Sequence, residues 1–169
     1  IVLTDPQYWA YKHIDGIKSP SSILITESAV YPSVFRFLCK KIICCQSNFP
    51  LEHYFDSFRN EKGTLVAGGS VASTAWNFAQ YAGASEIYVA GLDLAFVNKQ
   101  THIKGSTFEQ ATHTTSKRIA TAETSNMPIL FSGNACYEKN YKQQNVLTDQ
   151  RMKMFAWWFE SRLASLPQI

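Results

Sequence analysis

Apolar positions fall in short runs that alternate with helix-period segments along most of the chain. This pattern is typical of βα units and a parallel sheet. Three strands are predicted in the first part of the chain, over residues 1–4, 22–26 and 42–45. Asp5-Pro6 predicts a capped helix after the first strand, and residues 32–38 predict a short helix before the third.

The middle of the chain carries the clearest βαβ pattern. Residues 64–67 predict a strand, and the glycine turn, Gly68-Gly69-Ser70, follows it. An apolar stripe at helical spacing then predicts a helix over residues 71–82, and residues 86–90 predict the next strand, which leads to Asp93. Because crossovers between parallel strands are right-handed, the glycine turn and Asp93 are expected at the same edge of the sheet, where open α/β proteins bind ligands.

Apolar periodicity disappears over residues 97–126, where Thr, Ser, His, Lys and Gln dominate. We interpret this segment as a long polar loop insertion, and its place after Asp93 favours a lid or an active-site loop. Residues 128–132 predict a last strand, and Thr148-Asp149 predict the cap of a final amphipathic helix. The chain is therefore expected to form a single α/β domain over 1–169, with an open, mostly parallel sheet and flanking helices.

The composition of the 169-residue chain fits a folded domain, because 46% of its residues are hydrophobic and only 17% are charged. The net charge of +3 is too small to predict non-specific binding to nucleic acid. The longest apolar runs, such as residues 87–92, are far shorter than the roughly 18 residues that a membrane-spanning helix needs. We therefore expect neither nucleic acid nor a membrane as a partner.

The four cysteines show neither the spacing of metal ligands nor a dense disulfide pattern. We interpret them as buried thiols in a reducing, cytoplasmic compartment. No His-x-x-x-His or Cys-x-x-Cys pair is present for zinc, so no metal site built from these residues is expected. Ile1 begins inside a predicted strand, so we expect the chain to be a fragment of a longer protein.

Three places in the sequence suggest ligand chemistry. The glycine turn precedes a helix, where free N–H groups favour an anion, although a tight turn with a Ser cap explains the same residues. Asp93 and Asp5 each follow a predicted strand, where a carboxylate can bind a sugar hydroxyl or a metal ion, or can cap the next helix. Thr101-His102 lies in the polar segment, where a histidine suits proton transfer but is also common as a solvated side chain.

Several of these residues belong to longer motifs that resemble one known family. The run of residues 68–75 that starts with the glycine turn is followed by Gly83-Ala84-Ser85-Glu86-Ile87, by Gly91-Leu92-Asp93-Leu94-Ala95-Phe96, by Thr101-His102 and by Gly105-Ser106. Thr4-Asp5-Pro6-Gln7 and Thr148-Asp149 extend the likeness to nearly the whole chain. These motifs resemble the motility-associated-factor glycosyltransferases of bacteria, which share a domain with archaeal 6-hydroxymethylpterin diphosphokinases.

The resemblance implies a Rossmann-like, sialyltransferase-like domain that transfers a nonulosonic sugar from a CMP donor to Ser or Thr of flagellin, with no cofactor. It implies that the glycine turn, Asp93, Thr101 and Asp5 hold the donor, and that His102 is the catalytic base or a phosphate-stabilising acid. The family's upstream Gly-x-Gly-x-Ser-Leu turn is absent here. N-terminal strands are therefore expected to be missing, and an inactive fragment is one alternative.

Two other functions remain open at this point. The pterin branch implies pyrophosphate transfer from ATP with magnesium, for which Asp5 and Asp93 are the expected ligands. A non-enzymatic interaction module is the other, because Trp157-Trp158 and further aromatic residues can cover a partner domain. Metal-dependent nucleotide binding favours pyrophosphate transfer, and metal-independent CMP binding favours the glycosyltransferase. The absence of nucleotide binding favours the interaction module.

Overall fold

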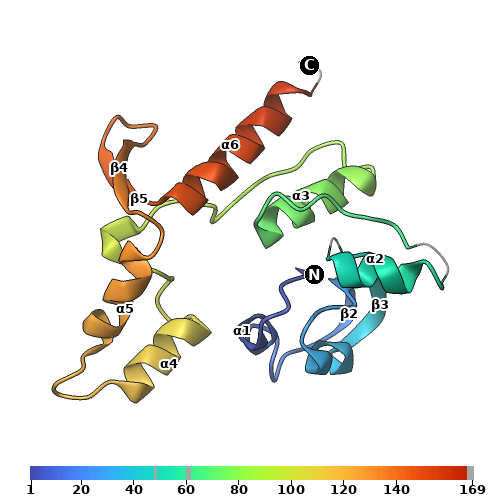
Figure 1. Cartoon of the computed structure of the whole chain (residues 1–169), viewed down its shortest axis with the longest axis horizontal. Helices are drawn as coiled ribbons and strands as arrows, with labels where there is room; N and C mark the ends of the chain where they lie inside the picture. The colour runs from blue at the N-terminus through green and yellow to red at the C-terminus, as the bar shows by residue number, and fades with distance from the viewer. Residues whose placement is uncertain (48, 60–61, 167–169) are drawn as a thin grey trace. The chain divides into compact units, whose positions relative to one another are not determined.

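The computed structural model describes residues 1–47, 49–59 and 62–166, and it divides into two compact units (Figure 1). Unit 1 runs from Ile1 to Tyr88, and unit 2 runs from Val89 onward. No helix among the described residues is long and apolar enough to cross a membrane.

Unit 1 is built on a parallel three-stranded sheet. Its strands are β1 (Val2–Leu3), β2 (Lys18–Glu27) and β3 (Leu38–Cys45), in the spatial order β1-β2-β3. Leu3 lies opposite Thr26 in the register of β1 and β2. The three strands predicted from residues 1–45 are confirmed, and so is their parallel arrangement.

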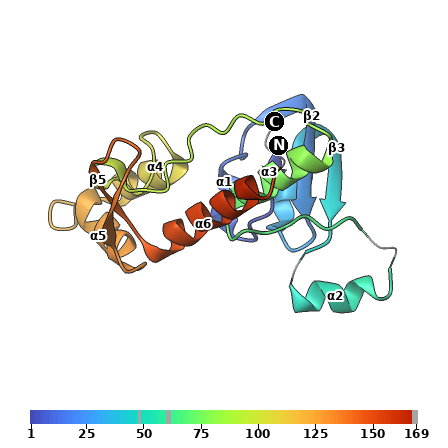
Figure 2. The ribbon, with the colours of Figure 1, turned by 90° about the horizontal axis from the view of Figure 1, so that it is seen from above.

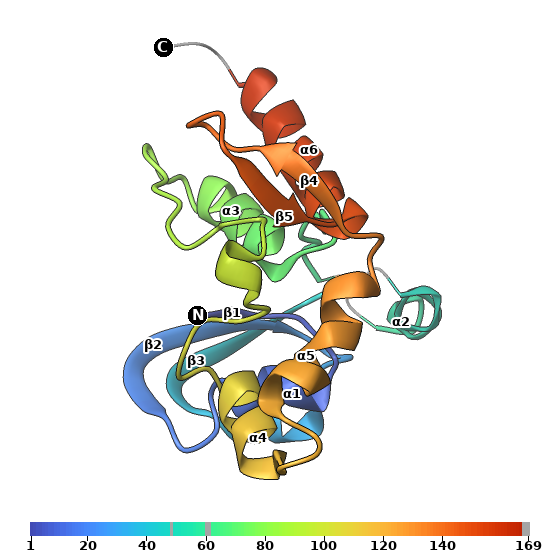
Figure 3. The same ribbon diagram turned by 90° about the vertical axis from the view of Figure 1, so that its left-hand side faces the viewer.

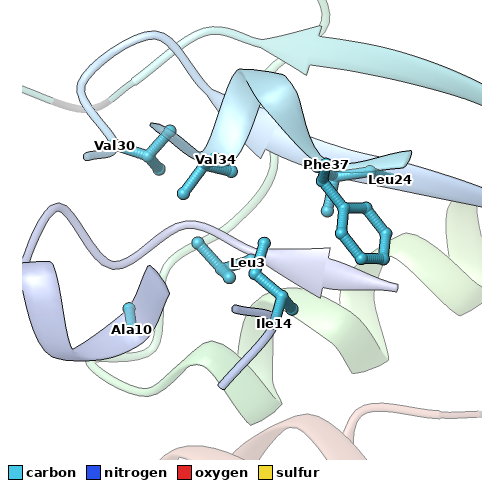
Figure 4. Close-up of a cluster of buried hydrophobic side chains, with 7 residues drawn as sticks. All are labelled: Leu3, Ala10, Ile14, Leu24, Val30, Val34 and Phe37. Carbon is cyan, nitrogen blue, oxygen red and sulfur yellow. The ribbon is translucent and has the colours of Figure 1, made fainter. Parts of the chain in front are cut away.

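One face of this sheet is covered by the segments that connect its strands. They contain α1 (Tyr8–Lys12) and the 3₁₀ helix η1 (Pro32–Arg36). Figure 4 shows their side chains meeting those of the sheet in one apolar cluster. The cluster consists of Leu3, Ala10, Ile14, Leu24, Val30, Val34 and Phe37.

The opposite face is covered by α3 (Val71–Tyr81) and the segment before it (Figure 2). Successive residues of a strand point to opposite faces, so Ile25 points away from the cluster that contains Leu24. Ile25 packs with Leu65, and Phe78 of α3 adds to the same cluster. Connecting segments thus lie on both faces of the parallel sheet, which makes unit 1 an open α/β structure, as predicted.

The two further strands predicted for this sheet do not form in the described residues. Of residues 64–67, Thr64 alone forms a bridge, to Gln46. Residues 86–90 form no strand, and Tyr88 among them is 87% exposed. An apolar run becomes a strand only where a neighbouring strand accepts its hydrogen bonds, and these residues have none. The expectation that Asp93 follows a strand is therefore wrong.

A further helix, α2 (Pro50–Asp56), follows β3 and was not predicted. Pro50 occupies its first turn, a position where proline is favoured because it lacks an N–H. Lys62 Nζ lies 2.8 Å from Glu52 Oε1 and ties α2 to the segment that follows it. The Lys62 ammonium, together with the nearby Ser28 hydroxyl, lowers the pKa of Glu52 from its ordinary value.

Unit 2 contains an antiparallel hairpin followed by the last helix (Figure 3). The hairpin pairs β4 (Cys136–Lys139) with β5 (Asn145–Thr148), and α6 (Gln150–Ala164) follows it. Helix α6 was predicted and is confirmed, but the hairpin was not predicted. The Thr148 hydroxyl donates to the Leu94 carbonyl at 2.8 Å, which fastens the start of unit 2 to β5.

The polar segment 97–126 is not one continuous loop. It contains the 3₁₀ helix η2 (Val97–Lys99), the whole of α4 (Thr107–Thr115) and the first turns of α5 (Ala122–Phe131). Ser106 and Thr121 cap α4 and α5, accepting hydrogen bonds from the backbone N–H groups of their first turns. The strand expected over residues 128–132 is wrong, because this short apolar run lies mostly in α5, and such runs fit either element.

Asp149 fixes the start of α6. Its side chain is fully buried, and Oδ1 accepts a hydrogen bond from Met152 N at 2.9 Å. Arg151 donates to Oδ2 through Nη2 at 2.6 Å and through Nε at 3.1 Å. A Cβ atom on Gly133 would lie 2.2 Å from Oδ2, so this glycine makes room for the cap. The predicted capping role of Asp149 is confirmed.

Candidate functional site

The glycine turn leads directly into α3 and is held in place by hydrogen bonds. Gly69 has a φ of +86°, a conformation that side chains disfavour. Ser70 caps the helix by accepting from Ala72 N at 3.2 Å. Ser73, which is 1% exposed, accepts from Gly68 N at 2.8 Å and donates to the Ser70 carbonyl at 2.5 Å. These hydrogen bonds within the protein hold the turn in its shape without a ligand.

Three backbone donors in the glycine turn and at the start of α3 are left for an anion. Within the described part of the chain, the N–H groups of Gly69, Ser70 and Val71 make no hydrogen bond to a protein group. Gly69 and Ser70 come just before α3 and Val71 is its first residue, at the end where the helix dipole is positive. Gly69 is exposed, and its lack of a side chain leaves the backbone open to close approach. This arrangement can bind a phosphate or another small anion.

Asp5 lies in unit 1, two residues after the end of β1. Its Oδ1 accepts a hydrogen bond from Gln7 N at 2.8 Å. The residue that caps α1 is Gln7, and the helix begins at Tyr8, so the expected capping role of Asp5-Pro6 is wrong. The side chain is half-buried and forms a local turn, which leaves its other carboxylate oxygen for a ligand.

Glu27 and Ser47 lie at the same carboxyl edge of the sheet and were not singled out from the sequence. Glu27 ends β2 and is 8% exposed. Burial raises the pKa of its carboxyl group, the charge of Glu52 adds to this effect, and a hydrogen bond from Ser47 opposes it. The sequence around a glutamate at the end of a strand does not show whether its side chain is buried or exposed, so Glu27 could not be identified from the sequence.

Cys45 lies opposite Glu27 in the register of β2 and β3. Its thiol donates to the Thr26 carbonyl at 3.0 Å, and burial, followed by the charge of Glu27, raises its pKa to about 11. This thiol therefore stays protonated and unreactive at neutral pH. The interpretation of Cys45 as a buried thiol is confirmed, whereas Cys39, Cys44 and Cys136 are only partly buried.

Thr101 and His102 lie together in unit 2 on the wall of a cavity of about 690 Å³. His102 Nδ1 is 3.1 Å from Thr101 Oγ1, and the imidazole ring stacks on Phe108 with 4.3 Å between ring centroids. Both residues are half-buried. The stacking and the threonine contact restrict the orientation of the His102 ring at the cavity wall.

Asp93 lines a different cavity of unit 2, of about 510 Å³, beside the hairpin and α6. The side chain is exposed, and Tyr141 and Trp157 lie on the same cavity wall. The structure thus brings Thr101 and His102 together and places Asp93 apart from them. The glycine turn and Asp5 belong to unit 1. No group of three or more His, Cys, Asp or Glu side chains among the described residues could hold a metal ion.

Comparison with known proteins places the chain in a family. Residues 1–99 match the family described as 6-hydroxymethylpterin diphosphokinase MptE-like, which covers all of unit 1 and residues 89–99 of unit 2. An uncharacterized protein of Treponema pallidum (strain Nichols) is 35% identical over 199 aligned residues, covering 100% of this chain and 51% of the relative. The chain therefore spans about half the length of this curated relative. No solved structure matches the chain. The family match covers more than half of the sequence and confirms the shared domain, so the chain belongs to the MptE-like family.

Proposed function

We propose that the chain is the nucleotide-binding part of a glycosyltransferase that moves a nonulosonic sugar from a CMP donor to Ser or Thr of flagellin. The observation that carries this proposal is the glycine turn and the start of α3, where three N–H groups make no hydrogen bond to any group of the described residues. A nucleoside monophosphate leaving group presents a phosphate of the charge and size that such a turn binds. Membership of the MptE-like family supports a phosphate-binding role for unit 1.

In the proposed reaction, the acceptor hydroxyl attacks the anomeric carbon of the sugar, and the bond from that carbon to the phosphate oxygen breaks. CMP leaves with the electron pair, and the N–H groups of the glycine turn stabilise its phosphate charge. His102 accepts the proton of the acceptor hydroxyl. Asp93, Thr101 and Asp5 contact the donor. No cofactor is required, and neither nucleic acid nor a membrane takes part.

We assign this activity to the cytoplasm. None of the four cysteines forms a disulfide in the described part of the chain. Reduced cysteines are typical of proteins from a reducing compartment.

A second candidate is pyrophosphate transfer from ATP to a pterin, which the description of the matched family favours. This reaction uses magnesium, which binds through one or two carboxylates together with the phosphates of the nucleotide. Asp5 fits such a role, because one of its carboxylate oxygens is held by Gln7 and the other is left for a ligand. Asp93 is the other candidate ligand.

Calorimetric titration of the protein with CMP, CDP, UDP and ATP, each with and without magnesium, separates these functions. The transferase predicts that CMP binds without magnesium. Magnesium-dependent binding of ATP, with no binding of CMP, would favour pyrophosphate transfer instead. If no nucleotide binds, the aromatic surface that includes Trp157, 65% exposed, would favour an interaction module.

A further inference from the structure

The cavity in unit 2 that holds His102 has the features of a ligand site. It lies between η2, α4 and α5, and its volume of about 690 Å³ falls in the range of sites for small molecules. Its apolar lining comes from α5, where Ala122 and Leu130 are 6% and 5% exposed and Met127 adds a flexible side chain. A buried apolar surface beside polar side chains suits a ligand with both an apolar and a charged part.

Two carboxylates line this cavity, but the protein already uses both. Glu109 accepts a hydrogen bond from Gly105 N through Oε2, and its Oε1 lies 4.0 Å from His113 Nε2. Glu123 lies in the first turn of α5, where its own backbone N–H and the Thr121 hydroxyl lower the pKa of its carboxyl group. Both carboxylates are thus held by contacts within unit 2.

Two lysines of the lining are available to a ligand. Lys99 and Lys104 are exposed and form no ion pair with any described residue. Lys99 and its neighbour Asn98 have φ values of +61° and +52°, a left-handed conformation that non-glycine residues rarely adopt twice in succession. His102 and His113 add two further polar groups to the same cavity. The lining therefore carries two exposed cations that make no ion pair within the described residues, beside two carboxylates that are held by contacts of their own.

We propose that this cavity binds a small organic anion, with its apolar part against α5 and its phosphate or carboxylate group near Lys99 and Lys104. The inference goes beyond the proposed transferase function, which uses only Thr101 and His102 of this cavity, because it assigns an anionic ligand to the two lysines and to the apolar lining from α5. Lys104 is the cation to test, because its side chain is exposed and its charge can be removed without disturbing the apolar lining.

The test follows the backbone and histidine signals of the protein by NMR during titration with three probes of similar size. Phenyl phosphate and benzoate carry the two candidate anionic groups, and benzyl alcohol is the neutral control. The proposal predicts saturable shifts at His102, His113 and the residues of α5 with at least one anion, and weaker binding of benzyl alcohol. The tighter of the two anions identifies the charged group.

The matched variants are Lys104→Met and Lys117→Met, which remove an exposed lysine inside and outside the cavity lining. Lys104→Met should weaken the anion about fivefold or more, as expected for the loss of one partly solvated charge contact, and Lys117→Met should change little. Unchanged spectra at α5 in both variants would show that they fold alike. Equal binding in the two variants, equal binding of benzyl alcohol, or no anion binding at this cavity would each overturn the proposal.

Discussion

Replacing Gly69 with Val should weaken nucleotide binding about a hundredfold, while the same replacement at Gly83 should leave binding intact. The two glycines flank α3, one at each end, with φ values of +86° and +82°. A side chain in this left-handed region costs about 1–2 kcal/mol, so the two variants should lose a similar free energy of unfolding. A Cβ atom on Gly83 would meet nothing within 4 Å, so this variant carries the backbone strain without a clash.

The expected loss of affinity follows from the number of donors at the glycine turn. A phosphate there can accept from the N–H groups of Gly69, Ser70 and Val71. If the valine side chain holds the phosphate away from two of them, two charge-assisted hydrogen bonds are lost, at about 1.5 kcal/mol each. The sum of about 3 kcal/mol corresponds to about a hundredfold increase in the Kd.

Isothermal titration calorimetry with CMP measures the affinity, and urea unfolding measures the stability of both variants. The account predicts a selective loss of affinity in Gly69→Val at matched stability. If Gly69→Val and Gly83→Val bind CMP equally well, the glycine serves the turn alone, and the reasoning that links its open backbone to a phosphate is refuted.

Four further expectations concern other parts of the chain. Asp149→Ala should lower the free energy of unfolding by about 2 kcal/mol, because the helix cap and the arginine contact are lost. Asp149→Asn keeps a capping oxygen and should lower it by less. Equal losses of the two variants in urea unfolding would contradict this. Because burial raises the pKa of Glu27 above its ordinary 4.5, its charge destabilises the fold fully above that raised value, and the penalty shrinks as pH falls toward 4.5 and is absent below it. Glu27→Gln should therefore stabilise the protein more at pH 7 than at pH 4, and a gain independent of pH would disprove it. Backbone amides of residues 97–126 should exchange hydrogen quickly in the free protein, because α4 has no buried residue. Their exchange should slow when the donor binds. Strong protection without ligand would exclude a lid. His102→Ala should lower kcat about a hundredfold while donor affinity changes less than about tenfold, and an unchanged kcat would return His102 to an ordinary surface histidine.

The elements that could be predicted are those whose signals are local. The helix over residues 71–82 was marked by an apolar stripe and a serine before it, and α3 begins with Ser70 as its cap. The final helix was marked in the same way by Asp149. For the first three strands, the short apolar runs were sufficient because each run pairs with a neighbour in the sheet.

The elements that could not be predicted depend on partners distant in the sequence. Residues 86–90 have the composition of a strand, but no described neighbour pairs with them. The run before Ser132 fits a strand or a helix equally, and only its packing decides for α5. The hairpin turn could have been recognised at Asn140, whose Oδ1 accepts from Lys142 N at 2.9 Å and from Gln144 N at 3.0 Å.

The candidate site was predictable in part for the same reason. The glycine turn carries its own signal, a pair of glycines and a serine before a helix, and its expected geometry at the start of α3 is what the structure has. The cavity around His102 has no such signal, because it depends on how α4 packs on α5. Glu27 was missed because its burial is set by β3 and the segment after it rather than by its neighbours in sequence.

The central claim is that the glycine turn binds the phosphate of a nucleotide. It is tested most directly by titrating CMP into the isotope-labelled protein without magnesium and following the amide signals of Gly69, Ser70 and Val71. These three signals should move together and saturate, because their N–H groups would donate to the phosphate. CMP binding that leaves all three signals unmoved would contradict it.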